Sequence, residues 1–279
     1  MATDLHQPPW KKAAWYGALT ALGVVVLFPV YMTVVRALSQ PKAYVDANQP
    51  PWPVHIEWNV FSQAFTEADL GRKFLVSAVV TVLIVSGQLI TSILAAYAFT
   101  FLTFPLRRLL FFVFMATLML PIEVTLIPNV QTIRSLGWLN SYPALAGPFL
   151  ATAFGTFLLC QGFRGIPRDL LDASQLDGFG HLAFLRRVAL PVTRPVVASF
   201  GVIAFLAAWN QYTWPRAVVT EGRWETIQIG LRTLNQTTAV ESNNVAFAGA
   251  LLAALPILLL LIFLQRQLVR GLTTGAVKG

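Results

Sequence analysis

Residues 74–101 read FLVSAVVTVLIVSGQLITSILAAYAFTF, and this run contains no charged side chain. An α-helix rises 1.5 Å per residue, so about 20 mostly apolar residues cross the hydrocarbon core of a bilayer. The run therefore predicts a membrane-spanning helix. The composition of the 279 residues agrees, because 56% are hydrophobic and only 11% are charged, against roughly a quarter charged in ordinary soluble domains.

Other apolar runs of similar length lie on both sides of this one. The six predicted spans are residues 13–35, 74–101, 109–127, 142–163, 195–219 and 245–265. The first run is too long for the 7 to 15 apolar residues of a cleavable signal peptide, so we expect it to be retained. The sequence thus predicts an all-α membrane protein with about six transmembrane helices, forming a single transmembrane domain over residues 1–279.

The distribution of charge predicts the orientation. With six spans both termini share one side, and that side carries twelve Lys and Arg against four Asp, whereas the other carries eight against seven Asp and Glu. Lys and Arg favour the cytoplasmic side, so both termini are predicted to be cytoplasmic. A nucleic-acid binder would instead cluster its bases on a soluble fold. Two longer external loops, 37–73 and 220–244, are candidate docking surfaces.

Several kinds of chemistry are disfavoured. Cys160 is the only cysteine, which excludes an internal disulfide, and the three histidines are scattered without metal-ligand spacing. The phosphate-loop pattern G-x-x-x-x-G-K-[ST] is missing, and no Ser, His and Asp arrangement of a hydrolase is visible. We therefore expect a non-catalytic membrane protein that holds neither a metal nor a cofactor.

A polar segment, residues 164–194, interrupts the apolar pattern between the fourth and fifth spans. Its acidic and basic side chains are too costly to place in lipid, so it is predicted to lie in the cytoplasm. Pro167 and the acidic start at Asp169 favour a helix over 169–176, and Gly178 favours a turn. A second short helix is predicted over 181–188, ended by Pro191. The apolar faces of these helices either pack on their own spans or dock another protein.

The order of residues in this segment resembles a known motif. DASQLDGF (172–179), eight further residues and VALP (188–191) are similar to the EAA loop of permease subunits of bacterial ABC importers, whose pattern is E-A-A, two residues, D-G-A, eight residues and I-x-L-P. This chain has Asp172 in place of Glu, Ser174 in place of Ala and Phe179 in place of Ala. In that family the first helix of the loop, the coupling helix, sits in a groove of the cytoplasmic ATPase.

The resemblance implies a set of coupling residues and of partners. The residues that would contact or shape the ATPase interface are Asp169, Asp172, Ala173, Ser174, Leu176, Asp177, Gly178 and Pro191. The implied partners are a second homologous permease, two ATPase subunits or domains, and an external solute-binding protein. ATP and Mg would be bound by the ATPase and not by this chain, which would lie in a bacterial inner membrane.

Three further stretches resemble carbohydrate-type importers: LMLPIEVTLIP (118–128), WNQYTWP (209–215) and RQLVRGLTTGAVKG (266–279). The first two are most similar to the second permease of glycerol-3-phosphate importers. The resemblance implies a solute of the carbohydrate class: a sugar or oligosaccharide, glycerol-3-phosphate or a glycerophosphodiester.

Candidate substrate residues are polar groups within spans, because these are expensive in lipid and usually face a cavity or a partner. Asn210 and Gln211 can bond hydroxyl groups, with Trp209 and Tyr212 offering ring faces. The same residues could form an interfacial aromatic belt in which Asn210 caps a helix break. Glu123 is the only acidic residue well inside a span, roughly 21 Å along a straight helix from residue 109, and serves either the ligand or a helix contact.

Two other classes of protein remain as alternatives. An ion-coupled secondary transporter needs intramembrane ionisable groups, and only Glu123 is available. A membrane-bound transferase would need a catalytic cluster, which the sequence lacks.

Overall fold

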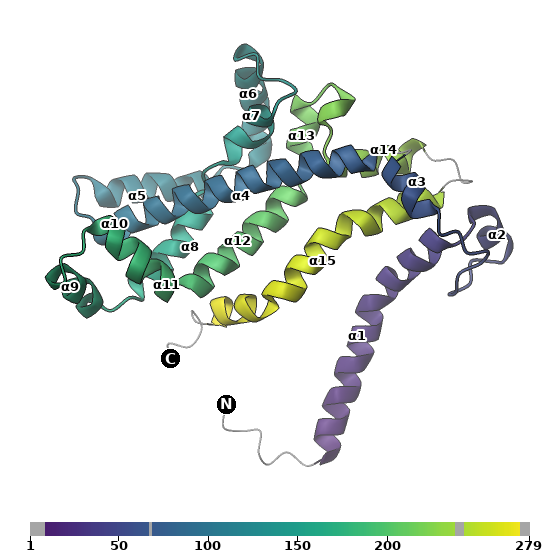
Figure 1. The fold of residues 1–279 in the computed structure, drawn as a ribbon, viewed down its shortest axis with the longest axis horizontal. Helices are drawn as coiled ribbons and strands as arrows, with labels where there is room; N and C mark the ends of the chain where they lie inside the picture. Colours follow the sequence, from purple (N-terminus) through teal and green to yellow (C-terminus); the bar gives the residue numbers. More distant parts are fainter. Residues whose placement is uncertain (1–8, 67–68, 238–242, 274–279) are drawn as a thin grey trace. The chain divides into compact units, whose positions relative to one another are not determined.

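The structure is a computed structural model that describes residues 9–66, 69–237 and 243–273 (Figure 1). These residues are helical or irregular, apart from one isolated bridge between Ser39 and Ile56. The all-α membrane fold predicted from the sequence is confirmed. The chain divides into two compact units, residues 1–70 with 231–254 and residues 71–230 with 255–279.

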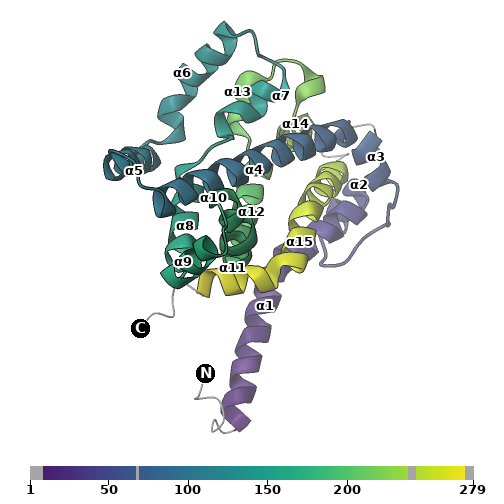
Figure 2. The same cartoon turned by 60° about the vertical axis from the view of Figure 1, so that its left-hand side comes forward.

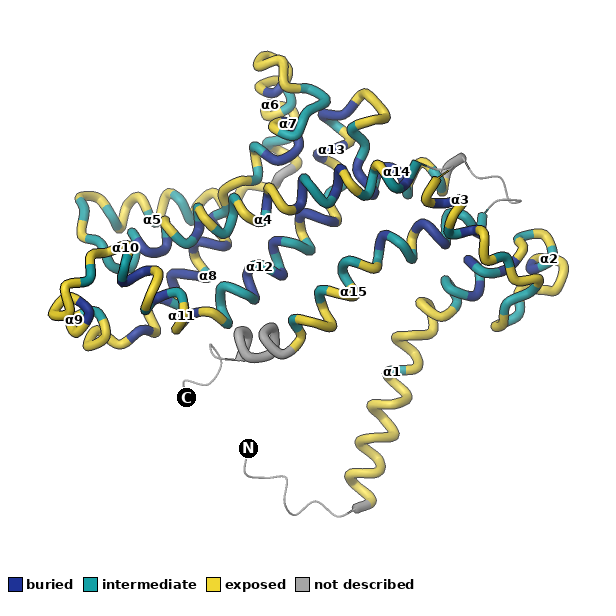
Figure 3. Tube along the Cα trace, viewed as in Figure 1, coloured by how far each residue is buried: buried dark blue, intermediate teal, exposed yellow. Residues whose placement is uncertain are grey.

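The first unit begins with a long apolar helix and continues into an ordered loop. Along most of α1 the side chains are exposed, as expected of a helix that faces lipid (Figure 3). In the loop, the Ser39 hydroxyl donates to the Val35 carbonyl (2.6 Å) and accepts from the Val54 N–H (3.1 Å). The helices of this unit are α1 (Pro9–Leu38), α2 (Pro41–Asp46) and α3 (Val60–Thr66), with parts of α14 (Ile227–Thr237) and α15 (Asn243–Thr273).

The second unit is built along α4 (Leu70–Phe101), against which α8 (Ala153–Arg164) and α12 (Arg194–Trp209) lie in both views (Figures 1 and 2). The other α-helices of this unit ahead of α14 are α5 (Arg107–Ala116), α6 (Ile122–Ser135), α7 (Tyr142–Ala146), α9 (Arg168–Leu176), α10 (His181–Phe184), α11 (Leu190–Val192) and α13 (Thr213–Val218). Short 3-10 turns occur at Thr117–Met119, Gly147–Phe149 and Gly222–Trp224, and a π turn at Leu185–Ala189.

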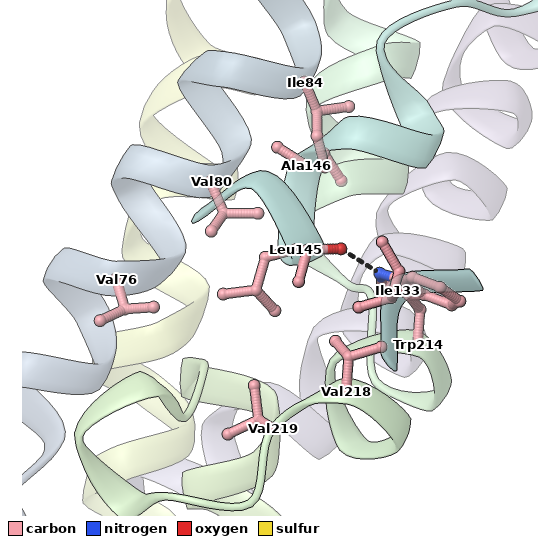
Figure 4. Close-up of a cluster of buried hydrophobic side chains, with 11 residues drawn as sticks. Val76, Val80, Ile84, Ile133, Leu145, Ala146, Trp214, Val218 and Val219 are labelled. Atoms are coloured by element: carbon pink, nitrogen blue, oxygen red, sulfur yellow. Dashed lines mark hydrogen bonds between the residues drawn. The ribbon is translucent and has the colours of Figure 1, made fainter. Parts of the chain in front are cut away.

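Two apolar clusters hold the second unit together. One joins the first half of α4 to α7 and α13 (Figure 4), and within it the Trp214 indole N–H donates to the Ala144 carbonyl at 2.9 Å. That bond pairs a buried donor that would otherwise be costly to desolvate. The other cluster joins the second half of α4 to α8, α10 and α12 and includes the fully buried Phe163 and Phe184.

The described residues contain three unbroken helices long and apolar enough to span a membrane: Trp10–Leu38, Leu70–Phe101 and Asn243–Gln265. Three bent helix pairs raise the number to as many as six, which agrees with the predicted number. The bends are 100° between Arg107–Met119 and Glu123–Ser135, 45° between Tyr142–Phe149 and Ala153–Arg164, and 81° between His181–Val192 and Arg194–Trp209.

Breaks in the helices correct three of the predicted spans, of which the fourth, 142–163, is the pair Tyr142–Phe149 and Ala153–Arg164 bent by 45°. The third, 109–127, is not one straight helix, because Pro121 has extended backbone angles and starts a new helix there. Glu123 therefore lies in the first turn of α6, and its predicted position along a straight helix is wrong. In the fifth span, 195–219, α12 ends at Trp209 and α13 begins at Thr213.

Candidate functional site

The polar segment 164–194, which we call the EAA-type loop, folds as a helix, a turn and a helix. It lies at the end of the second unit where α4 finishes and α5 begins (Figures 1 and 2). Asp177 ends α9, and its N–H donates to the Ala173 carbonyl at 3.0 Å. Gly178 follows with a φ of +77°, a conformation that glycine adopts without the steric cost of a side chain. The predicted first helix and turn are confirmed.

The second helix is longer than predicted, because Pro191 does not end it. The helical run continues from His181 to Val192, with a π turn in which the Leu190 N–H donates to the Leu185 carbonyl. Proline lacks an N–H and clashes with the carbonyl four residues earlier, here that of Arg187. A π turn widens the helix immediately before the ring. The proline is therefore accommodated inside the helix, and the chain bends only afterwards, by 81°, into α12.

The two faces of α9 have opposite surroundings. On the inner face Ser174 is buried and donates to the Leu171 carbonyl at 2.7 Å, while Leu171 packs against the second apolar cluster. The outer face carries Asp169, Ala173 and Leu176, and the Leu176 side chain is 91% exposed. Asp172 is also exposed. The helix α9 is thus amphipathic: its inner face packs on the second apolar cluster, and its outer face exposes a leucine to solvent.

The EAA-type loop is tied to α4 by aromatic packing and one hydrogen bond. The Phe184 ring lies edge-on to Phe101 with centroids 5.3 Å apart. The Tyr97 hydroxyl and His181 Nδ1 are 3.0 Å apart, within hydrogen-bond distance. Behind the turn, the Arg187 guanidinium lies over the Phe179 ring at 5.2 Å. These contacts join the second half of the loop to the end of α4.

The candidate substrate residues at the end of α12 have different surroundings from one another. Trp209 is 3% exposed and packs on the rings of Phe74 (5.2 Å) and Phe205 (5.8 Å), so it is a core residue in this conformation. Asn210 is exposed, and its amide donates to the Leu206 carbonyl at 2.8 Å, which caps the end of α12. Tyr212 starts the segment that leads into α13.

A side chain that the sequence did not single out joins this group. Gln228, in the first turn of α14, donates from Nε2 to the Trp209 carbonyl (3.3 Å) and lies 3.4 Å from Asn210 Oδ1. Gln211 Oε1 is buried without a partner among the described residues. Gln228 was missed because residues 220–244 lack a long apolar run, which predicts a loop. Ile227, Leu231 and Leu234, at spacings of four and three residues, have the period of a helix with one apolar face and would have indicated it.

Glu123 is not part of this group. It is exposed in the first turn of α6, where a carboxylate is favoured by the partial positive charge of a helix N-terminus. Among the described residues, no set of three or more His, Cys, Asp or Glu is placed to hold a metal ion.

The family of binding-protein-dependent transport system inner membrane components matches residues 88–274. The chain belongs to this family. It is 34% identical over 261 residues to the sn-glycerol-3-phosphate transport system permease protein UgpE of Rhizobium meliloti strain 1021, covering 89% of this chain and 91% of that one. The same protein of Agrobacterium fabrum strain C58 is 33% identical over 267 residues, covering 91% and 93%.

A solved structure shares the fold of this permease. A chain of a bacterial ABC transporter involved in the import of the acidic polysaccharide alginate aligns with a TM-score of 0.82 at 20% identity, covering 95% of this chain and 99% of that one. The chain is thus a multi-pass permease subunit of an ABC importer, as predicted, and not an ion-coupled transporter. The EAA-type loop lies inside the matched region.

Proposed function

We propose that this permease forms one half of the translocation pathway for a small polar solute of the glycerol-3-phosphate or sugar class. A second, homologous permease forms the other half. Two ATPase subunits or domains bind ATP with Mg and hydrolyse it, and an external binding protein delivers the solute. Both termini and the EAA-type loop lie on the cytoplasmic side.

The outer face of α9 carries this proposal. Leu176 is 91% exposed, on the same face of α9 as the charged Asp169, in a segment too polar for the bilayer. A helix of nine residues is marginal on its own in water, but here its inner face is anchored. An anchored helix with an uncovered leucine is suited to insertion into the groove of a partner protein.

The contacts of the loop suggest how motion would pass to the membrane. When ATP binding draws the ATPases together, α9 moves with them. The Phe184 packing and the Tyr97 to His181 contact transmit this movement to α4, and the continuous chain transmits it to α12. The bundles then rotate as rigid bodies and turn the shared cavity outward, and hydrolysis resets them.

The coupling role is tested by changing the outer face of α9 and the turn. Leu176→Asp removes the apolar contact, and Asp172→Lys reverses a charge. Gly178→Leu forces a side chain into the left-handed turn. We expect all three to insert in the membrane and to lose ATP-driven uptake in proteoliposomes. Arg186→Gln, at an exposed position in the second helix, is the control. Unchanged uptake in the three variants would refute the coupling role.

The solute class rests on the relatives and on the amide group at the end of α12. The relatives at 33–34% identity are named for sn-glycerol-3-phosphate transport. Asn210, Gln211 and Gln228 carry amides, which both donate to and accept from hydroxyl groups. In this conformation the Gln228 amide donates to the Trp209 carbonyl, and Gln211 Oε1 is buried. The solute would take over these bonds when α12 and α14 separate.

The solute is identified by uptake into proteoliposomes that contain the complete importer and its binding protein. Competing sn-glycerol-3-phosphate, glycerophosphodiesters, trehalose and maltose-like sugars rank the candidates. Gln211→Ala and Gln228→Ala should lower solute-stimulated transport by about tenfold, which corresponds to one lost hydrogen bond. Basal ATP hydrolysis should not change, and Gln265→Ala, at an exposed position of α15, is the control. Unaltered transport kinetics would instead make these amides parts of the scaffold.

A further inference from the structure

The inner side of α9 borders a cavity, and of the residues that line it only Asp172 belongs to the proposed coupling residues. Its volume is about 520 Å³, and it lies within the second unit, between α9, the end of α4 and the start of α5. Its polar lining combines three cations with one carboxylate: Arg107, Arg164, Arg168 and Asp172. The rings of Phe101 and Phe163 form part of the wall.

The arginines are held in place but are not neutralised. The half-buried Arg107 donates from Nη1 to the Leu102 carbonyl at 2.9 Å, and the Arg164 guanidinium lies over the Phe111 ring at 5.6 Å. Among the described residues, none of the three forms an ion pair with a carboxylate within 4.0 Å. The cavity therefore has an excess of two positive charges, with the guanidinium groups available to an anion.

The surface next to the cavity is apolar. On α5 the exposed side chains include Leu109, Leu110, Phe112 and Val113, in a helix that forms part of a candidate membrane span. Arg107, at the start of α5, lines the cavity. An anion held here would lie at headgroup depth, with an apolar helix surface directly beside it.

We propose that this cavity binds the phosphate headgroup of an anionic phospholipid, with an acyl chain along α5. The excess positive charge attracts a phosphodiester, and basic pockets between transmembrane helices on the cytoplasmic side suit anionic headgroups. The ATPase would contact Asp169, Ala173 and Leu176, on the other face of α9. The lipid would hold the Arg168 end of the coupling helix against the bundle. The choice of leaflet rests on the proposed function.

The test uses the complete importer in nanodiscs of phosphatidylcholine with phosphatidylglycerol, followed by native mass spectrometry. We expect phosphatidylglycerol to stay bound to the wild-type complex and to Arg186→Gln, which does not line the cavity. Arg107→Gln and Arg168→Gln should each lower its occupancy about fivefold, the effect expected for removal of one cation near a lipid surface. The double variant Arg107→Lys with Arg168→Lys should retain it, since the charge is kept.

Several results would overturn the proposal. Equal lipid retention in all variants would show that the arginines do not bind the lipid. Loss in the lysine variant would show that the glutamine variants act by changing the shape of the cavity and not its charge. Displacement of the lipid by inorganic phosphate would assign the cavity to a soluble anion. Glutamine variants that keep the lipid but lose the ATPase subunit would assign the arginines to the ATPase interface.

The lipid site and the proposed solute fail independently. Lipid retention in an importer that does not transport the proposed solutes would refute the solute class and support the lipid site.

Discussion

Asn140 shows how one side chain can fasten two loops of this permease. Its Oδ1 accepts from the N–H groups of Thr220 (2.7 Å) and Glu221 (3.1 Å), and its Nδ2 donates to Thr220 Oγ1 (2.8 Å) and Glu221 Oε1 (3.3 Å). Its φ of +56° belongs to the left-handed region, which asparagine tolerates better than most residues. Both the backbone and the side chain thus favour asparagine at this position.

We therefore expect Asn140→Ala to destabilise the second unit. The substitution removes all four bonds and keeps the unfavourable backbone angle. Four bonds at about 0.5–1.5 kcal/mol each would give about 2–6 kcal/mol, but the bonds are exposed and water replaces part of them, so we expect a loss of about 1–3 kcal/mol. Thermal unfolding of the purified complex in detergent measures the change. Asn129→Ala removes an exposed amide of α6 and should have little effect. Equal melting of the two variants would contradict the role given to Asn140.

Gly155 allows α8 to approach α4 and α12 closely. A Cβ atom at this position would lie 2.1 Å from the Phe200 ring and 2.6 Å from the Ser92 hydroxyl, both fully buried. Close approach through small residues is a common basis of helix packing in membranes. Gly155→Ala should lower the free energy of unfolding by about 1–3 kcal/mol through overpacking, measured as a loss of thermal stability and of folded yield. Gly147→Ala, which meets no atom within 4 Å, is the matched control.

At the scale of helices, the sequence predicted those elements whose signals are local. Pro167, Asp169 and Gly178 mark the start and end of α9, and the structure places both ends there. The break at Pro121 was missed because apolar residues continue on both sides of it, so that composition alone suggested one span. The surroundings of Trp209 also escaped prediction, since its contact with Phe74 joins residues that are distant in the chain.

The contact between α4 and α10 gives a prediction at this scale. Tyr97→Phe keeps the ring beside Phe101 (5.1 Å) and removes the bond to His181. The stability should fall by only about 1 kcal/mol, while uptake per ATP hydrolysed should fall more, because the loop and the helix would then move less closely together. Paired measurements of uptake and hydrolysis in proteoliposomes give this ratio, and Tyr16→Phe, exposed on α1, is the control. A ratio equal to that of the wild type would show that the aromatic packing alone joins the two helices.

At the scale of the whole molecule, the exposed apolar surface indicates that this chain does not act alone. Leucine, valine and phenylalanine residues are exposed along α1 and α5, and most of the trace of both helices has the colour of exposed residues in Figure 3. Such surface is stable only against lipid or against other protein. The importer family to which the chain belongs is consistent with burial against lipid and against protein, and under the proposed function the outer face of α9 would contact the ATPase on the aqueous side.

The orientation in the membrane can be tested because Cys160, the only native cysteine, is fully buried. Gly180 lies in the EAA-type loop and Gly222 between α13 and α14, and an added Cβ meets no atom within 4 Å at either position. In spheroplasts, a membrane-impermeant maleimide should label Gly222→Cys and leave Gly180→Cys and the wild type unlabelled. After permeabilisation of cells that lack the ATPase subunit, Gly180→Cys should also react. The opposite pattern would place the coupling helix outside the cell and refute the charge-based orientation. It would also refute the coupling role, since an ATPase supplied with cytoplasmic ATP could not reach the helix.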